Sequence, residues 1–232
     1  QLRQAPVYYR YIMKIDIISD TVCPWCFIGK RRLEKALAMR PEMVPEINWY
    51  PFQLNPEMPE EGIERTLYLS LKFGSAERAN EIYGSVSEAS TSEDLDINFD
   101  AIQRMPNSLK SHRLIQFSRL KGSQHAIMEN LFRSYFFYGT DIGSLDALLD
   151  IARDSGLDQT EVRHYLESDQ DLDLVRTQDI QSRKMGVSGV PCFIIADEFA
   201  VSGAQEPEVF LQVFDAAKQL KPVTTCLLYT SD

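Results

Sequence analysis

The sequence lacks any apolar run close to the roughly 20 residues that a membrane-spanning helix needs. It also has little positive charge, because 24 lysine and arginine residues stand against 34 aspartate and glutamate residues, a net charge of −10. Nucleic acids need a basic face for their phosphates, and anionic membranes attract basic segments. We therefore expect no nucleic-acid partner and no membrane partner.

Cysteine and histidine are sparse as well, with four and three residues in a chain of 232. Four cysteines at this length do not form the disulfide framework of a small secreted domain. The N-terminal residues "QLRQAPVYYRYI" lack the apolar core and the cleavage site of a signal peptide. These features favour a reducing compartment, and we expect a cytoplasmic protein.

The N-terminal quarter of the chain predicts a strand, a helix and a second strand. Residues 14–19 alternate and are rich in isoleucine, which is typical of a strand. A helix is expected from about Pro24, since a proline at the first helical position has no hydrogen bond to lose. A second strand is expected over 46–54. A helical crossover between two strands implies that they are parallel.

The middle of the chain, residues 60–185, predicts a series of helices and no strand. One helix, in "HAIMENLFRSYFFYG", carries two adjacent apolar rows, which predict a wide buried face. The members of the two rows are Ile127, Leu131 and Tyr135, and Met128, Phe132 and Phe136.

Strand character returns near the C-terminus. Segments 189–197 and 198–203 are separated by a short turn, which predicts a hairpin. A last helix is expected over 207–220, with Val209, Val213, Ala216 and Leu220 on one face.

This order of elements predicts an α/β fold: β-α-β, a helical insertion, then β-β-α. The main domain would be discontinuous, and the chain ends would be extensions outside it. The expected parts are 13–59 with 186–220 for the main domain, 60–185 for the insertion, and 1–12 with 221–232 for the extensions.

The motif "CPWC", residues 23–26, carries the strongest functional signal. A zinc site needs about four ligands, but Cys192, Cys226 and the histidines show no ligand spacing. A purely structural disulfide would close a short loop and remove little chain entropy. A redox pair is favoured, because the motif opens a helix directly after the first strand of a βαβ unit. We expect no metal and no bound cofactor.

The two cysteines predict different roles in that redox pair. Cys23 lies at the expected helix N-terminus, where unpaired N–H groups and the helix dipole stabilise a thiolate. It is the expected nucleophile, and Cys26, one turn further, is the expected resolving thiol. Pro24 and Trp25 between them form an apolar lip.

A second signal is "VP", Val190 and Pro191, at the start of a strand. Pro191 cannot donate a ladder hydrogen bond, so it fits either an ordinary edge strand or a cis-proline loop. Together with the upstream cysteine motif, we favour a cis-proline loop that faces Cys23. The neighbouring Cys192 is read as a small buried hydrophobic residue, with a third redox thiol as the alternative.

The segments "SDTVCPWCFIGKRRLEKAL", "YPFQLNPEMPEEG", "PNSLKSHRL", "LFRSYFFYGTDIG" and "GVSGVPCFIIADEFAVSGAQEPEVF" resemble the DsbA family of the thioredoxin superfamily. Within it they look like the FrnE-like branch, related to 2-hydroxychromene-2-carboxylate isomerase and kappa-class glutathione transferase. The resemblance implies a thioredoxin-like fold with a helical insertion, and thiol–disulfide oxidoreductase activity on protein or glutathione substrates. Glutathione is the implied co-substrate, and a homodimer is a candidate assembly.

The resemblance also implies site residues beyond the cysteines. Asn107 and His112 match a segment that reaches the cleft from the helical part, although His112 could equally be a surface or capping residue. Gln205 matches the place where relatives bind the γ-glutamyl end of glutathione, before a helix N-terminus that suits a carboxylate. Phe52 is expected in the core or lining the cleft.

Two departures from the relatives keep other functions open. Isomerase and kappa-class relatives carry serine where Cys23 stands, so Cys23 favours disulfide chemistry. The kappa class has a Ser-Asp pair where this chain has Ala204 and Gln205, which weakens the case for glutathione binding. The alternatives are a glutathione-dependent isomerase or transferase, and a non-enzymatic redox-sensing binding module.

Overall fold

The computed structural model describes residues 11–74 and 76–220. The expected extensions, apart from Tyr11 and Ile12, lie outside the described residues, as does Cys226. A four-stranded sheet forms the centre, with the order β2-β1-β5-β6. Its strands are β1 (Tyr11–Ser19), β2 (Met43–Pro51), β5 (Cys192–Ile195) and β6 (Phe199–Ser202).

The N-terminal β-α-β unit forms as the sequence predicts. Helix α1 (Pro24–Ala38) begins at Pro24, and β1 and β2 pair in parallel, with Ile17 opposite Trp49. The first strand starts earlier than expected, because Tyr11 is buried and Ile12 continues the alternation outward. Tyr11 and Ile12 therefore belong to the sheet rather than to an extension.

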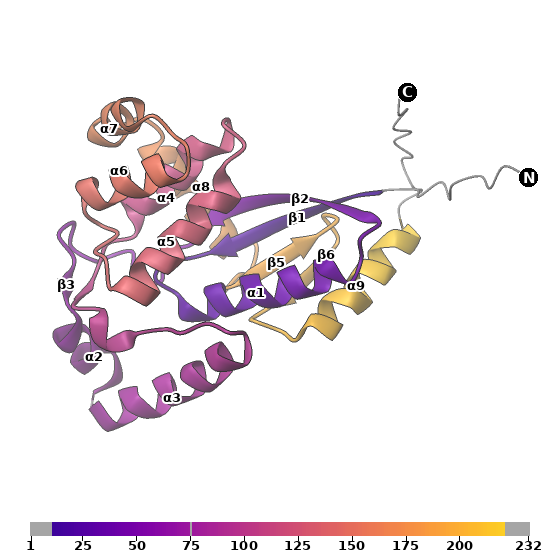
Figure 1. Cartoon of the computed structure of the whole chain (residues 1–232), viewed down its shortest axis with the longest axis horizontal. Helices are drawn as coiled ribbons and strands as arrows, with labels where there is room; N and C mark the ends of the chain where they lie inside the picture. The colour runs from indigo at the N-terminus through magenta and orange to yellow at the C-terminus, as the bar shows by residue number, and fades with distance from the viewer. Residues whose placement is uncertain (1–10, 75, 221–232) are drawn as a thin grey trace, which may run out of the picture.

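The C-terminal hairpin and helix are also confirmed. Strands β5 and β6 pair antiparallel, and β5 pairs antiparallel with β1. Helix α9 (Pro207–Leu220) lies beside α1 across one face of the sheet (Figure 1). The buried residues of α9 are not those of the predicted apolar face but lie one position further along, at Phe210, Phe214 and Ala217, together with Pro207. The two phenylalanines bury more apolar area than the valines beside them.

Seven helices lie between β2 and β5 in the described chain. Figure 1 shows them gathered at the end of the sheet where β1 ends and α1 begins. Both predicted apolar rows of α5 are buried. The helices are α2 (Arg65–Phe73), α3 (Ala76–Ser92), α4 (Leu109–Arg119), α5 (Gln124–Tyr138), α6 (Leu145–Asp154), α7 (Gln159–Glu167) and α8 (Leu172–Lys184).

The expectation that this middle region contains no strand was wrong. Strand β3 (Ile63–Glu64) pairs antiparallel with β4 (Arg104–Met105). Two residues are too few to leave an alternating pattern in the sequence, so the pairing follows from the tertiary structure. A short 3₁₀ helix, η1 (Phe99–Ala101), precedes β4.

The sheet separates the core into two parts. Ile15 and Ile17 face the main cluster, which includes Phe27 of α1 and Phe193. The neighbouring Ile18 points to the opposite face and packs in a smaller cluster with Phe52 and Cys192.

Among the described residues, no helix is long and apolar enough to cross a membrane. The expected domain boundaries remain a prediction.

Candidate active site

Cys23 is the N-cap residue of α1, directly before Pro24 at the first helical position. Its backbone is extended, with φ −94° and ψ 112°, and the first turn of α1 contains no acidic residue. The unpaired N–H groups and the positive end of the helix dipole therefore act near the Cys23 sulfur without an opposing carboxylate in that turn.

The Val190–Pro191 loop faces Cys23 from the start of β5. The Cys23 thiol donates to the carbonyl oxygen of Val190, with a sulfur–oxygen distance of 3.6 Å. The peptide bond between Val190 and Pro191 is cis. The N–H of Gly203 donates to the carbonyl of Pro191 at 2.8 Å and ties the loop to the end of β6. The structure thus brings together two motifs 167 positions apart.

Gly29 allows this loop to lie close to α1. A Cβ at Gly29 would lie 2.9 Å from Cγ of Pro191 and 3.1 Å from Cζ of Phe193. The contact with Pro191 is shorter than carbon–carbon packing allows, and the contact with Phe193 is tight enough that the ring would have to shift. The absence of a side chain at Gly29 therefore sets the distance between α1 and the Pro191 loop.

Cys26 lies one turn into α1 and is almost fully buried, with 1 % of its surface exposed. Burial raises the pKa of the Cys26 thiol well above its usual value, and the neighbouring Cys23 raises it further. The hydroxyl of Ser19 and the backbone of Asp20 act in the opposite direction. A thiol in this state attacks poorly until its proton is removed.

A buried carboxylate lies at the turn between β1 and α1. Asp20 has no exposed surface, and its Oδ2 accepts the N–H of Leu54 at 2.7 Å. Its Oδ1 lies 3.2 Å from Nε2 of His112, on α4. His112 is 3 % exposed, so the alternative of a surface residue was wrong. A residue of the helical region and the turn before Cys23 are therefore joined by a buried hydrogen bond.

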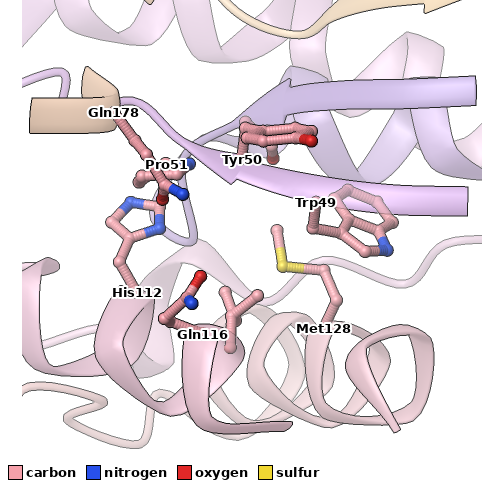
Figure 2. Close-up of a pocket in the computed structure, with 9 residues that line it drawn as sticks. Trp49, Tyr50, Pro51, His112, Gln116, Met128 and Gln178 are labelled. Carbon is pink, nitrogen blue, oxygen red and sulfur yellow. The ribbon is translucent and has the colours of Figure 1, made fainter. Parts of the chain in front are cut away.

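A small cavity opens beside this pair (Figure 2). It offers about 10 Å³ to the centre of a water molecule, which is room for roughly one. Two buried oxygens of the lining, Oγ of Ser19 and Oε1 of Gln178, have no hydrogen-bond partner in the described protein. Figure 2 shows the ring of His112 and the side-chain amides of Gln116 and Gln178 pointing toward one another. The full lining is Ser19, Trp49, Tyr50, Pro51, His112, Ile115, Gln116, Met128 and Gln178.

The segment after β2 is fixed from α8. Asp179 accepts the N–H of Gln53 at 2.7 Å, and Arg183 lies over the ring of Phe52, 4.0 Å from its centroid. Phe52 is 2 % exposed and packs with Ile18. It is a core residue, so the expectation that it lines a substrate pocket is not supported by its position.

The side chains of Asn107 and Gln205, which the resemblance also implies, form hydrogen bonds with backbone groups near them and not with the cysteines. Asn107 donates to the carbonyl of Met58 at 2.6 Å and borders a pocket of about 460 Å³ with Lys110. Gln205 is exposed before α9, and its side-chain amide donates to the carbonyl of Ser202 at 2.8 Å. Both side chains are engaged in holding local backbone.

The lip residues Pro24 and Trp25 are partly buried beside Cys23. Cys192 is buried at 5 % exposure, and burial alone raises the pKa of its thiol. It lies with Ile18 on the opposite face of the sheet from the main core, as expected of a small hydrophobic residue. Within the described residues, no group of three or more acidic, histidine or cysteine side chains is placed to hold a metal.

Sequence reasoning missed three residues of this site. Ser19 and Asp20 precede the cysteine motif in "SDTVCPWC", and Gly29 follows it. A polar pair directly after a buried strand was the available signal for the first two. Nothing local marked Gly29, because its role depends on Pro191.

Comparisons with known proteins agree with this arrangement. A family model described as a DsbA-like thioredoxin domain matches residues 14–215. The uncharacterized protein YwbO of Bacillus subtilis (strain 168) is 26 % identical over 204 residues, covering 84 % of this chain and 92 % of YwbO. The structure of a probable DsbA oxidoreductase from Streptomyces coelicolor superimposes with a TM-score of 0.81 and 28 % identity, covering 93 % of this chain and 94 % of that one.

The chain therefore belongs to the DsbA-like thioredoxin family, a family of thiol–disulfide oxidoreductases and isomerases. More distant structures share the fold alone. A 2-hydroxychromene-2-carboxylate isomerase has a TM-score of 0.62 at 16 % identity, covering 89 % of this chain and 95 % of its own. The cytosolic disulfide reductase DsbM of Pseudomonas aeruginosa, solved with GSH, has a TM-score of 0.62 at 13 % identity, covering 89 % and 98 %. These neighbours are consistent with the FrnE-like branch.

Proposed function

We propose that the chain is a thiol–disulfide oxidoreductase whose redox pair is Cys23 and Cys26. The observation that carries the proposal is the placement of Cys23. It caps α1 and its sulfur lies 3.6 Å from the Val190 carbonyl, while Cys26 lies buried behind it. A substrate disulfide that reaches Cys23 would lie against the backbone of the Val190–Pro191 loop.

The reaction follows from these positions. The Cys23 thiolate attacks one sulfur of a substrate disulfide, the substrate S–S bond breaks, and the leaving sulfur takes a proton. Cys26, once deprotonated, then attacks the Cys23 sulfur, and the second substrate thiol leaves. The substrate disulfide is reduced by two electrons and the cysteine pair is oxidised by two. Glutathione is the proposed donor that returns the pair to dithiol, in a reducing compartment.

The test is glutathione-dependent reduction of a model disulfide by the wild type, Cys23→Ser and Cys26→Ser, with Cys192→Ala as a matched cysteine control. We expect Cys23→Ser to be inactive, Cys26→Ser to accumulate a mixed disulfide on Cys23, and Cys192→Ala to turn over normally. Mass spectrometry of the acid-quenched protein identifies the mixed disulfide.

Three results would overturn the proposal. A wild type without exchange activity would favour a binding module. Full activity of Cys23→Ser would show that Cys23 is not the nucleophile. Full glutathione-dependent turnover of Cys26→Ser, with no trapped intermediate, would favour an isomerase or transferase that only activates glutathione.

A further inference from the structure

The resolving thiol, Cys26, must lose its proton before it attacks Cys23, and the cysteine pair itself offers no group to accept that proton. It is 1 % exposed, so bulk water does not reach its sulfur. Burial also disfavours the thiolate that must form before it attacks Cys23. A polar group that reaches Cys26 inside the protein would help this step by accepting the proton when the mixed disulfide is resolved.

Ser19 is the polar side chain next to Cys26 that has no other bond to make. It is 1 % exposed, its Oγ has no hydrogen-bond partner in the described protein, and its hydroxyl favours the Cys26 thiolate. With no protein partner, the Ser19 hydroxyl is free to bond a water in the adjacent cavity.

Ser19 also lines the small cavity that His112 borders. The Nε2 of His112 lies 3.2 Å from Oδ1 of Asp20. In the tautomer that donates from Nε2 to Asp20, Nδ1 keeps a free electron pair. The unpaired Oε1 of Gln178 in the same cavity provides an acceptor for a bridging water.

From this arrangement we propose that Ser19 and His112 form a proton path for Cys26, with His112 oriented by Asp20. The inference rests on the proposed function, because it concerns the second step of the same exchange. It assigns a chemical task to His112, which the resemblance had placed only in a segment that reaches the cleft.

The step balances as follows. The Cys26 sulfur gives its proton to Oγ of Ser19, which passes its own hydroxyl proton through a cavity water to Nδ1 of His112. The Cys26 electron pair forms the bond to Cys23, and the bond from Cys23 to the substrate sulfur breaks. The substrate thiolate takes a proton from solvent. His112 keeps its proton until the cysteine pair is reduced again, when the same path returns the proton to the Cys26 thiolate.

The test separates the two chemical steps in a single turnover. The wild type, Ser19→Ala and Ser19→Thr are mixed in reduced form with a model disulfide. Thr21→Val is the matched control, since Thr21 also has a buried hydroxyl in this turn, bonded to Ser111 at 2.7 Å and outside the cavity. Acid quenching and mass spectrometry give the rate at which the mixed disulfide forms on Cys23 and the rate at which it resolves.

For Ser19→Ala we expect mixed-disulfide formation at the wild-type rate and resolution slowed about tenfold or more. Ser19→Thr restores resolution, and Thr21→Val resolves like the wild type. The melting temperature of Ser19→Ala stays close to that of the wild type, because no hydrogen bond to another protein group is lost. A purely structural role for Ser19 would lower it instead.

Wild-type resolution in Ser19→Ala would overturn the inference, as would equal slowing in Ser19→Ala and Thr21→Val, or slowing of both steps together. His112→Asn provides a second check, with slow resolution expected and wild-type resolution counting against the path. A wild type that forms no mixed disulfide at all would instead overturn the proposed function, so the two failures are distinguishable.

Discussion

Gly29 on α1 and Pro191 before β5 lie so close that a Cβ at position 29 would be 2.9 Å from Cγ of the proline. The contact joins the helix that carries both cysteines to the loop that faces Cys23. The distance between the cysteine pair and the loop is therefore set one turn beyond the "CPWC" motif, at a position without a side chain.

We predict that Gly29→Ala lowers both stability and exchange activity. The added methyl overpacks against Pro191 and Phe193, which costs about 1–3 kcal/mol and displaces the loop from Cys23. Gly84→Ala is the matched control, because a Cβ at Gly84 on α3 meets nothing within 4 Å. It should gain about 0.5–1 kcal/mol from helix propensity. Urea unfolding and turnover measure both effects, and equal stability changes at the two glycines would contradict this role.

Asp20 is predicted to be a major contributor to stability at the redox turn. Asp20→Asn weakens the hydrogen bonds from His112 and from the N–H of Leu54, and we expect a loss of about 2–3 kcal/mol. The control is Asp158→Asn, because exposed Asp158 caps α7 through two backbone N–H groups and asparagine caps equally well. Similar unfolding free energies for the two variants would show that burial of the Asp20 carboxylate adds little.

A charge network between α1 and α5 predicts a loss of stability in acid. Burial tends to raise the pKa of Glu34, but bonds to His125, Lys30 and Arg31 outweigh it and hold that pKa at about 2. A depressed carboxylate pKa stabilises the fold above the unfolded value of about 4.3 and loses that effect as pH falls from about 5 to about 2.

Glu34→Gln should therefore lower stability at neutral pH and flatten its decline between about pH 5 and pH 2. Exposed Glu57 in the loop after β2 gives a control, and Glu57→Gln should leave the slope unchanged. Denaturant unfolding at intervals across this range measures the slope. An unchanged slope in Glu34→Gln would mean that the network does not stabilise the ionised carboxylate.

Cys192 is predicted to have no part in the redox cycle. Its pKa is raised by burial, so the thiol stays protonated near neutral pH and reacts slowly. Cys192→Ala should keep wild-type exchange, whereas Cys192→Ser should lose more stability because it buries a hydroxyl among apolar side chains. Turnover and thermal unfolding of both variants provide the measurement. Loss of turnover in Cys192→Ala would establish Cys192 as a third redox thiol.

Local sequence determined the elements that carry the cysteines. An isoleucine-rich alternation ended by polar residues forms β1, and Pro24 after Cys23 starts α1, because these preferences act between neighbouring residues. The two apolar rows of α5 were readable for the same reason. The face of α9 was misread by one position, since neighbouring rows of similar hydrophobicity differ only in what they meet across the interface.

Only the tertiary structure decided the neighbours of the two cysteines. The contact of Pro191 with Gly29, the hydrogen bond between Asp20 and His112, and the placement of Ser19 between Cys26 and a cavity join segments far apart in the chain. Such contacts depend on how the sheet and the helical region pack. A single sequence specifies that packing through the summed burial of many side chains rather than through a motif.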